Sequence, residues 1–251
     1  MKFINALDLK QREMICLVGA GGKTSIMYQL AKELSGTGAR VLVTTTTKMF
    51  DWQLKSCCNE VLIDNEESLL VKIKQYRSQT NLLAVCSGVF GEKIRGLSKE
   101  ALDEIYSLQL FDYILVEADG SRGKSLKAPA DHEPVLPTLT TTVLAVAGVD
   151  ILGYPLNEET VHRPHLVNQI TSEHLGQPVS VTTLIKVLRH YERVVKKSVP
   201  SLNWVPIFNK VDTPEDKQNA RNVARKLLSS STQKVLLTSA LVSDPVLEVV
   251  P

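Results

Sequence analysis

Short apolar segments alternate with segments of helical periodicity along most of the chain. Glu13–Val18 is a mostly apolar run of strand length, and a glycine-rich stretch follows it. Ile26, Leu30 and Leu34 then recur every four residues, which places them on one face of a helix, until two glycines end the pattern. This part of the sequence therefore predicts a strand, a tight loop and a helix, in that order.

The same alternation continues along the rest of the sequence. Further strands are expected at Arg40–Thr46, Val61–Ile63, Asn81–Cys86, Phe111–Val116, Thr141–Val149, Asn203–Phe208 and Lys234–Leu237. Helices are expected between them, at Glu66–Tyr76, Ser98–Leu108, Pro164–Ile170, Ser180–His190 and from Pro214 to about Leu228. Strands that alternate with helices are typical of a parallel sheet. We therefore predict an α/β fold with a mainly parallel sheet and helices on both of its faces.

The stretch from about residue 150 to residue 200 departs from this pattern. It has weaker strand character and many polar residues, and the apolar strands resume after it. We interpret residues 1–251 as a single domain in which residues 150–200 form a helical insertion.

Composition excludes several classes of protein. The formal charge of +2 does not favour general attraction to nucleic acid. No apolar run approaches the roughly 20 residues that a membrane-spanning helix needs, and Met1–Lys10 does not have the pattern of a signal peptide. The four cysteines lack the spacing of a zinc site and fit free thiols in a reducing compartment. We therefore expect a cytoplasmic protein that binds neither membranes nor nucleic acid.

The strongest chemical signal is a glycine-rich segment between the first strand and the first long helix. Glycines let the backbone turn sharply, so that main-chain N–H groups and the helix N-terminus converge on phosphate oxygens. In such a phosphate-binding loop (P-loop), the lysine contacts the β- and γ-phosphates and the next hydroxyl binds Mg²⁺. We therefore expect a nucleoside triphosphate to bind to Gly19, Ala20, Gly21, Gly22, Lys23, Thr24 and Ser25, with Mg²⁺ at Thr24.

The loop is shorter than the usual G-x-x-x-x-G-K-[ST] pattern. That pattern requires a glycine at position 17, where this sequence has Leu17. The compact loop resembles that of the Mur ligases and folylpolyglutamate synthases, which bind ATP. The nucleotide could therefore be GTP or ATP at this stage.

An apolar strand ending in acidic residues provides a second signal. Glu117 and Asp119 follow the run Phe111–Val116, as the carboxylate of a Walker B strand does. A carboxylate at this place holds Mg²⁺ and positions the attacking nucleophile. Glu117 is also spaced from Gly120 as in the GTPase D-x-x-G element, with Glu in place of Asp. Glu117 and Asp119 are both candidates for the metal and, together with Lys23, for catalysis, and an acidic strand end that only caps a helix is the alternative.

A third signal is the tetrapeptide Asn209-Lys210-Val211-Asp212 at the end of a late strand. GTPases recognise guanine with N-K-x-D, and a carboxylate suits the two adjacent N–H donors of guanine. The later segment Thr238-Ser239-Ala240 resembles the GTPase element that supports the base. We expect Asn209, Lys210 and Asp212 to bind the base and GTP to be favoured over ATP; an asparagine-capped turn is the alternative.

Polar and charged loops surround these elements. Thr44–Lys48 ends the second strand, where its hydroxyls could meet phosphate or Mg²⁺, although threonines are also ordinary strand residues. The loop Asp119–Lys127 carries three cations that could clamp an anionic second substrate, stabilise a transferred phosphate or simply face solvent. Pro164 interrupts the spacing of His162 and His165, which disfavours a helical metal site. The sequence assigns no single role to Arg122, Lys124, His162 or Arg163.

Several motifs in one order carry a resemblance to a known family. They are LVGAGGKTS (Leu17–Ser25), VLVTTTTKMF (Val41–Phe50), VEADGSRGKSLKAP (Val116–Pro129), DHEPVLP (Asp131–Pro137), VHRP (Val161–Pro164) and FNKVD (Phe208–Asp212). With these motifs the chain resembles the selenium-dependent molybdenum hydroxylase accessory proteins of the YqeC type. The resemblance implies a role in the maturation of a molybdenum hydroxylase or its cofactor, with that enzyme or its cofactor-assembly proteins as partners.

Taken together, the residue patterns predict a Mg²⁺-dependent P-loop protein that hydrolyses GTP, and the resemblance implies that it assists the maturation of another enzyme. An ATP-dependent ligase or kinase acting on a small anionic substrate is one alternative. A scaffold that binds nucleotide without hydrolysing it is another. The oligomeric state is left open.

Overall fold

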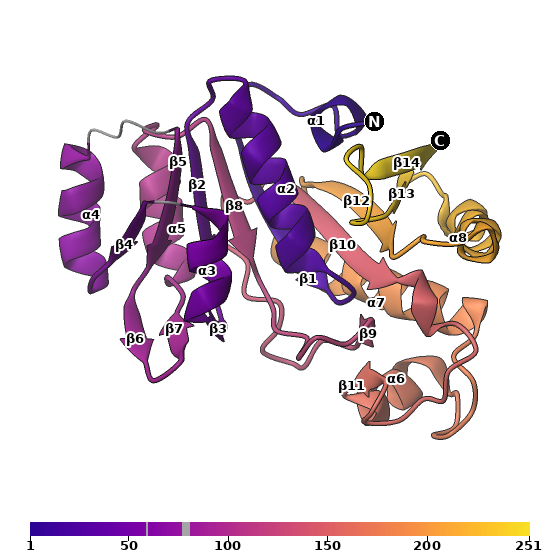
Figure 1. Cartoon of the computed structure of the whole chain (residues 1–251). Coiled ribbons are helices and arrows are strands. Elements are labelled where there is room, and N and C mark those ends of the chain that lie inside the picture. The colour runs from indigo at the N-terminus through magenta and orange to yellow at the C-terminus, as the bar shows by residue number, and fades with distance from the viewer. Residues whose placement is uncertain (59, 77–80) are drawn as a thin grey trace.

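The computed structural model describes residues 1–58, 60–76 and 81–251, and its centre is a large twisted sheet (Figure 1). In this part of the chain nine strands form the sheet in the order β14-β13-β12-β10-β1-β8-β2-β5-β4. Neighbouring strands are parallel except for the pair β13 and β14. The strands are β1 (Glu13–Gly19), β2 (Val41–Thr45), β4 (Val61–Ile63), β5 (Leu82–Cys86), β8 (Tyr113–Glu117), β10 (Thr142–Gly148), β12 (Asn203–Asn209), β13 (Val235–Thr238) and β14 (Val246–Val250).

Helices cover both faces of this sheet. On one face α1 (Phe3–Ala6), α2 (Lys23–Gly36) and α3 (Asp51–Cys57) pack, and on the other α4 (Glu66–Gln75), α5 (Lys99–Ser107), α7 (Val181–Ser198) and α8 (Pro214–Leu227). Alternate residues of β1 serve the two faces, since Ile15 packs with the α2 side and Cys16 with the α7 side. All seven residues of β1 are buried, as expected for a strand covered twice. The predicted α/β fold is confirmed.

The segment expected to be a helical insertion, residues 150–200, contains three short elements and one long helix. They are η1 (Val149–Ile151), β11 (Val161–His162), α6 (Pro164–Thr171) and α7. The helix α7 connects the parallel neighbours β10 and β12 and packs on the sheet through buried Leu184, Val187 and Tyr191. It extends to Ser198 instead of ending near His190, because Tyr191 and Val195 continue its apolar face.

Small strands that we did not predict lie beyond the carboxyl ends of the central strands. The antiparallel trio β3 (Lys48–Phe50), β7 (Lys93–Arg95) and β6 (Gly88–Phe90) follows β2 and β5. The two-residue strand β9 (Leu126–Lys127) pairs with β11. These additions carry several cationic and aromatic side chains to the edge of the sheet where parallel folds bind their ligands.

No helix within the described ranges combines the length and the apolar composition that a membrane span requires.

Candidate functional site

The glycine-rich loop lies at the carboxyl end of β1 and is held against β10. The Ala20 N–H donates to the Val146 carbonyl (2.9 Å), and the Gly21 N–H donates to the Lys124 carbonyl (2.9 Å). Gly22 has a φ of +110°, and a Cβ on it would overlap the amide nitrogen of Asn209. Only glycine satisfies both conditions, so the loop is shaped by its packing as well as by its turn.

The N-terminus of α2 follows this loop and opens into a cavity. The main-chain N–H groups of residues 22–25 have no hydrogen-bond acceptor within the described part of the chain, and these four residues line the cavity. No side chain caps the helix. Unpaired N–H groups and the positive end of the helix dipole together favour an anion such as phosphate.

Lys23 and Asp119 form a buried ion pair beneath the loop. The Lys23 ammonium lies 3.3 Å from Asp119 Oδ1 and donates to the Gly19 carbonyl (2.8 Å). The Gly19 N–H reaches both oxygens of Asp119 at 3.1 Å, and the Tyr191 hydroxyl donates to Oδ2 (2.8 Å). Asp119 is fully buried and does not line the cavity. Its carboxylate therefore contacts only interior groups, whereas Lys23 forms part of the cavity wall.

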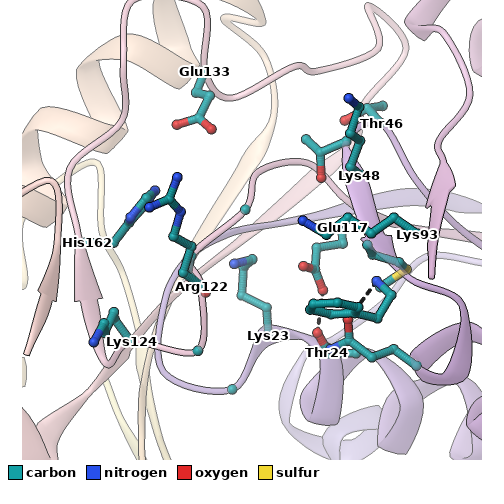
Figure 2. Close-up of a pocket in the computed structure, with 18 of the residues that line it drawn as sticks. Lys23, Thr24, Thr46, Lys48, Lys93, Glu117, Arg122, Lys124, Glu133 and His162 are labelled. Carbon is teal, nitrogen blue, oxygen red and sulfur yellow. Dashed lines mark hydrogen bonds between the residues drawn. The ribbon is translucent and has the colours of Figure 1, made fainter. Parts of the chain in front are cut away.

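Thr24 and Glu117 form the second pair of the site. The Thr24 hydroxyl donates to Glu117 Oε2 (2.6 Å), and both side chains line the cavity (Figure 2). A hydroxyl and a carboxylate next to a phosphate site are the oxygen ligands that Mg²⁺ takes from proteins, the remainder being phosphate and water. These two residues therefore fit a magnesium ion. In the residues described, no group of three or more His, Cys, Asp or Glu side chains forms another candidate metal site.

Asn209 connects the P-loop to the C-terminal strands. Its amide nitrogen donates to the Gly21 carbonyl (2.8 Å), and its amide oxygen accepts from the Thr238 hydroxyl (2.9 Å). Asp212 is exposed and accepts a hydrogen bond from the Ser239 hydroxyl (2.5 Å). Thr213 is the N-cap of α8, so Asp212 lies directly before the N-terminus of that helix. A small cavity of about 200 Å³ lies beside these residues and is lined by Ser25, Asn209, Ser239 and Ala240 among others.

Lys210 lies apart from the other two polar residues of its tetrapeptide. Its ammonium donates to Ser125 Oγ (2.7 Å) and Asp150 Oδ2 (2.9 Å), and its backbone has a φ of +62°. It lines the cavity at the P-loop, whereas Asn209 lines the small cavity.

The cavity at the P-loop has a volume of about 1190 Å³ and a strongly cationic wall. Among the described residues that line it, seven are cations and three are glutamates: Lys23, Lys48, Lys93, Arg122, Lys124, Arg163 and Lys210 against Glu117, Glu133 and Glu158. Figure 2 shows Arg122, Lys124 and His162 on one side and Lys48 and Lys93 on the other. Lys23, Thr24 and Glu117 lie between the two groups. This charge distribution favours polyanionic ligands.

The threonines at the end of β2 divide between the interior and the cavity. Thr44 donates to the Val85 carbonyl (2.7 Å), and Thr45 donates to the Glu117 carbonyl (2.8 Å), so both hydroxyls are used internally. Thr46 and Thr47 line the cavity, although the Thr46 hydroxyl is bonded to the Val135 carbonyl (2.9 Å).

A row of buried charges extends from Asp119 to the far wall of the cavity. Lys127 lies between two carboxylates, 3.1 Å from Asp119 Oδ2 and 2.8 Å from Glu133 Oε2, and Arg163 completes the row by pairing with Glu133. Burial raises the pKa of Glu133, but the hydrogen bonds from Arg163 and Lys127 outweigh that effect and lower the pKa to about 2. Glu133 and Tyr191 were not among the predicted site residues; Arg163 lies 30 residues from Glu133, and Tyr191 lies 72 residues from Asp119.

His162 stands among these cations. Burial and the positive charges of Arg163, Lys127 and Arg122 lower its pKa to about 4, although Glu133 opposes the shift. The imidazole is therefore neutral near pH 7, and its low pKa reflects first its burial and then the positive field on this side of the cavity.

Comparison with known proteins identifies the family. A family model described as "YqeC protein" matches residues 15–165, and the protein named YqeC of Escherichia coli (strain K12) is 34% identical over 214 residues. The chain belongs to the YqeC family. The alignment with the E. coli protein covers 82% of this chain and 79% of that one.

Two crystal structures of FtsY from Mycoplasma mycoides are also similar. They match at TM-scores of 0.35 and 0.33, with 12% and 14% sequence identity over 92% of this chain in each case. The matches cover 54% and 53% of the FtsY chains, so this chain spans about half of their length. Because these scores are low, the assignment of a P-loop architecture to this chain rests on its own strand order and loop geometry.

The segment matched by the YqeC family model contains most of the large cavity. The P-loop, Glu117, Asp119 and the row that ends at Arg163 all lie within residues 15–165. Asn209, Asp212 and Tyr191 lie outside that segment, on the strands and helices that complete the sheet.

Proposed function

We propose that this YqeC family member binds GTP with Mg²⁺ and hydrolyses it. The observation that carries the proposal is the double hydrogen bond of Asn209, which joins the Gly21 carbonyl of the P-loop to Thr238 of β13. This amide holds the phosphate loop and the Asp212–Ser239 pair at a constant separation, as recognition of one nucleoside triphosphate requires.

The phosphate end of the nucleotide would lie on the N-terminus of α2. The free N–H groups of residues 22–25 would bind phosphate oxygens, and Lys23 would contribute its charge from the cavity wall. The carboxylate of Asp119 positions Lys23 and the Gly19 N–H, and we assign it that role instead of metal binding because it is buried away from the cavity.

Thr24 and Glu117 would hold Mg²⁺. The ion, when bound, neutralises phosphate charge and acts as a Lewis acid toward the phosphoryl group. Glu117 also lies on the cavity wall, where its carboxylate can orient a water molecule toward the phosphate.

Asp212 would select guanine. The Ser239 hydroxyl donates a hydrogen bond to Oδ1 of Asp212 and fixes the orientation of the carboxylate, while the side chain remains exposed. A carboxylate held in this way can accept from two adjacent N–H groups of guanine, and adenine lacks that pair of donors. A site built to receive such donors rejects the base that lacks them.

The test is a calorimetric comparison of GTP, ATP and xanthosine triphosphate with the wild type and with Asp212→Asn. We expect GTP to bind more tightly than ATP, and Asp212→Asn to weaken GTP by about 10- to 100-fold, the equivalent of one to two lost hydrogen bonds to a charged group. The variant should gain affinity for xanthosine triphosphate, whose base presents an acceptor where guanine presents a donor. Asp244→Asn, at another exposed carboxylate, is the control. Guanine selection would be refuted if the wild type bound GTP and ATP with equal affinity and Asp212→Asn changed neither affinity.

We further propose that the nucleotide cycle serves the maturation of a molybdenum hydroxylase or its cofactor. The family resemblance supports this role. In cells that produce such a hydroxylase, replacing the wild-type chain by Lys23→Ala should lower the molybdenum and selenium content of the purified enzyme, measured by mass spectrometry. An unchanged metal and selenium content would contradict the role and leave the nucleotide site untouched.

The size and charge of the cavity favour a second candidate function, a kinase or ligase that uses ATP and acts on a small anionic substrate. Phosphate transfer to an added acceptor, in place of simple phosphate release, would distinguish it.

A further inference from the structure

The large cavity exceeds what the phosphates of one nucleotide occupy. Its volume of about 1190 Å³ is above the range of about 300–1,000 Å³ that whole drug-sized ligands fill. The residues to which we assign the base, Asn209 and Asp212, do not line it. Only the phosphate end of the nucleotide would therefore enter this cavity, and most of its volume is available to another molecule.

One end of the cavity combines cations with exposed aromatic rings. We call Lys48, Phe50, Trp52 and Lys93 the aromatic lobe; they come from β3, α3 and β7 and all line the cavity. The residues Phe50 and Trp52 are 40% and 65% exposed, and their ring centroids are 6.4 Å apart at an interplanar angle of 23°. Two exposed rings that are nearly parallel offer a stacking surface to a flat molecule.

Within the described part of the chain, the cations of the aromatic lobe form no salt bridge. Lys93 lies 5.2 Å above the centroid of the Phe50 ring, and neither Lys93 nor Lys48 forms a salt bridge in the described ranges. Lysines elsewhere on this surface, such as Lys55 on the same helix as Trp52, do have acidic partners. Unpaired ammonium groups beside a ring surface are suited to an anion attached to a flat ring.

We propose that the aromatic lobe binds a small flat aromatic anion, such as a phosphorylated or carboxylated heterocycle, beside the nucleotide triphosphate. The ring stacks on Trp52 and Phe50, and the anionic group lies between Lys48 and Lys93. The proposal rests on the proposed function only for the identity of the neighbouring ligand, because the lobe itself is built from residues outside the P-loop.

Trp52 provides a direct signal for this site. The chain contains two tryptophans, and Trp204 is buried with 4% exposure, so a ligand in the lobe quenches mainly the emission of Trp52. The probes are two matched pairs: riboflavin 5′-phosphate with riboflavin, and 1-naphthyl phosphate with 1-naphthol. Each pair has the same ring with and without the anion. We expect saturable quenching by at least one phosphorylated probe, with at least tenfold tighter binding than its uncharged partner.

Substitutions in the aromatic lobe test whether the probe binds there. The double variant Lys48→Gln/Lys93→Gln should lower the affinity for the phosphorylated probe at least tenfold, as measured by calorimetry. The affinity for the uncharged probe should stay within about twofold of the wild-type value. Trp52→Ala should lower the affinity for both members of the pair. Lys55→Gln, on the same helix α3, is the matched control and should leave both affinities unchanged. Absence of saturable quenching by both phosphorylated probes, or binding that these variants leave unchanged, would overturn the proposal.

Titration with Mg²⁺ and GTP separates this proposal from the proposed function. Saturating GTP should leave the probe bound, since the two ligands occupy different parts of the cavity. If GTP displaces the probe and itself quenches Trp52, the nucleotide base occupies the lobe and the proposal falls. If the probe binds as expected and GTP does not bind at all, the aromatic lobe stands and the GTP site falls.

Discussion

The ammonium of Lys23 lies 3.3 Å from the carboxylate of Asp119, and both side chains are almost completely buried. The predicted phosphate-binding lysine therefore already has an anionic partner. Asp119 also accepts from Gly19 and Tyr191 and pairs with Lys127, so it holds the base of the P-loop together. A nucleotide that binds here must share Lys23 with this carboxylate.

Asp119→Asn should destabilise the fold strongly. The substitution leaves the buried Lys23 and Lys127 with less opposing charge, and breaking a buried ion pair typically costs about 3–5 kcal/mol. Urea denaturation measures the loss of unfolding free energy. Asp112→Asn, which affects the exposed pair with Arg40, should cost about 1 kcal/mol or less. Equal stability of the two variants would show that Asp119 does not hold the loop.

Tyr191→Phe should remove one hydrogen bond to the same carboxylate without creating a cavity. Because the acceptor is charged, we expect a loss of about 2 kcal/mol in unfolding free energy. The double-mutant cycle with Asp119→Asn should show that the two losses are not additive, since the residues are in contact. Additive losses would mean that α7 is not coupled to the P-loop through this bond.

Glu117→Gln should separate nucleotide binding from Mg²⁺ dependence. We expect GTP affinity in EDTA to remain within about threefold, and the increase in affinity on adding Mg²⁺ to be largely lost, because Glu117 supplies one oxygen ligand. Phosphate release should fall by about 100-fold or more. Glu158→Gln, which changes another cavity glutamate, is the control. Wild-type protein that binds Mg²⁺ and GTP but releases no phosphate, even with its partner enzyme, would indicate a scaffold.

The ion pairs of Glu133 should make stability depend on acidic pH. Its pKa falls from the ordinary 4.5 to about 2 on folding, so its stabilising contribution is complete above pH 4.5 and is lost as pH falls toward 2. Glu133→Gln should cost about 3 kcal/mol at neutral pH, and the difference from the wild type should shrink between pH 4.5 and 2. Urea denaturation at each pH measures this, with the exposed Glu100→Gln as the control. A difference that does not change over this range would contradict the assigned ion pairs.

The pKa of His162 should report the charge of Arg122. Burial is the largest cause of this pKa of about 4, and Arg122 adds to it after Arg163 and Lys127, so Arg122→Gln should raise the pKa only part of the way toward 6.5. An NMR titration of the imidazole resonances measures the change. Arg193→Gln is the matched control, since Arg193 lowers the pKa of His190 and should leave His162 unaffected. An unchanged His162 in Arg122→Gln would remove Arg122 from this side of the cavity.

The sequence predicted the parts of the site that are local. The P-loop, the acidic end of β8 and the Asn209 tetrapeptide each fall on consecutive residues at the end of a strand, where period and spacing are visible. The placement of the central strands followed for the same reason. The assignment of Glu117, Asp119 and the base-binding residues to their ligands stays a prediction that the experiments above address.

The features that depend on long-range contacts escaped prediction. Tyr191 lies 72 residues from Asp119 and just beyond the expected end of its helix at His190. Nothing in its sequence neighbourhood distinguishes it from an ordinary core tyrosine. The trio β3, β7 and β6 consists of three-residue strands, which are too short to show a period, so the aromatic lobe, which combines β3 and β7 with Trp52 of α3, was also missed.

The side chain of Asn209 contacts Gly21 of the P-loop, which lies 188 residues away in the sequence. Under the proposed function, the phosphate-binding loop and the base-binding residues therefore share one contact and are not independent modules. A fragment that ends before β12 would keep every residue of the glycine-rich loop and yet lose the anchor that fixes its shape. Dissection of this protein into smaller working pieces should therefore fail, and nucleotide exchange should respond to changes at the last two strands as strongly as to changes at the loop itself.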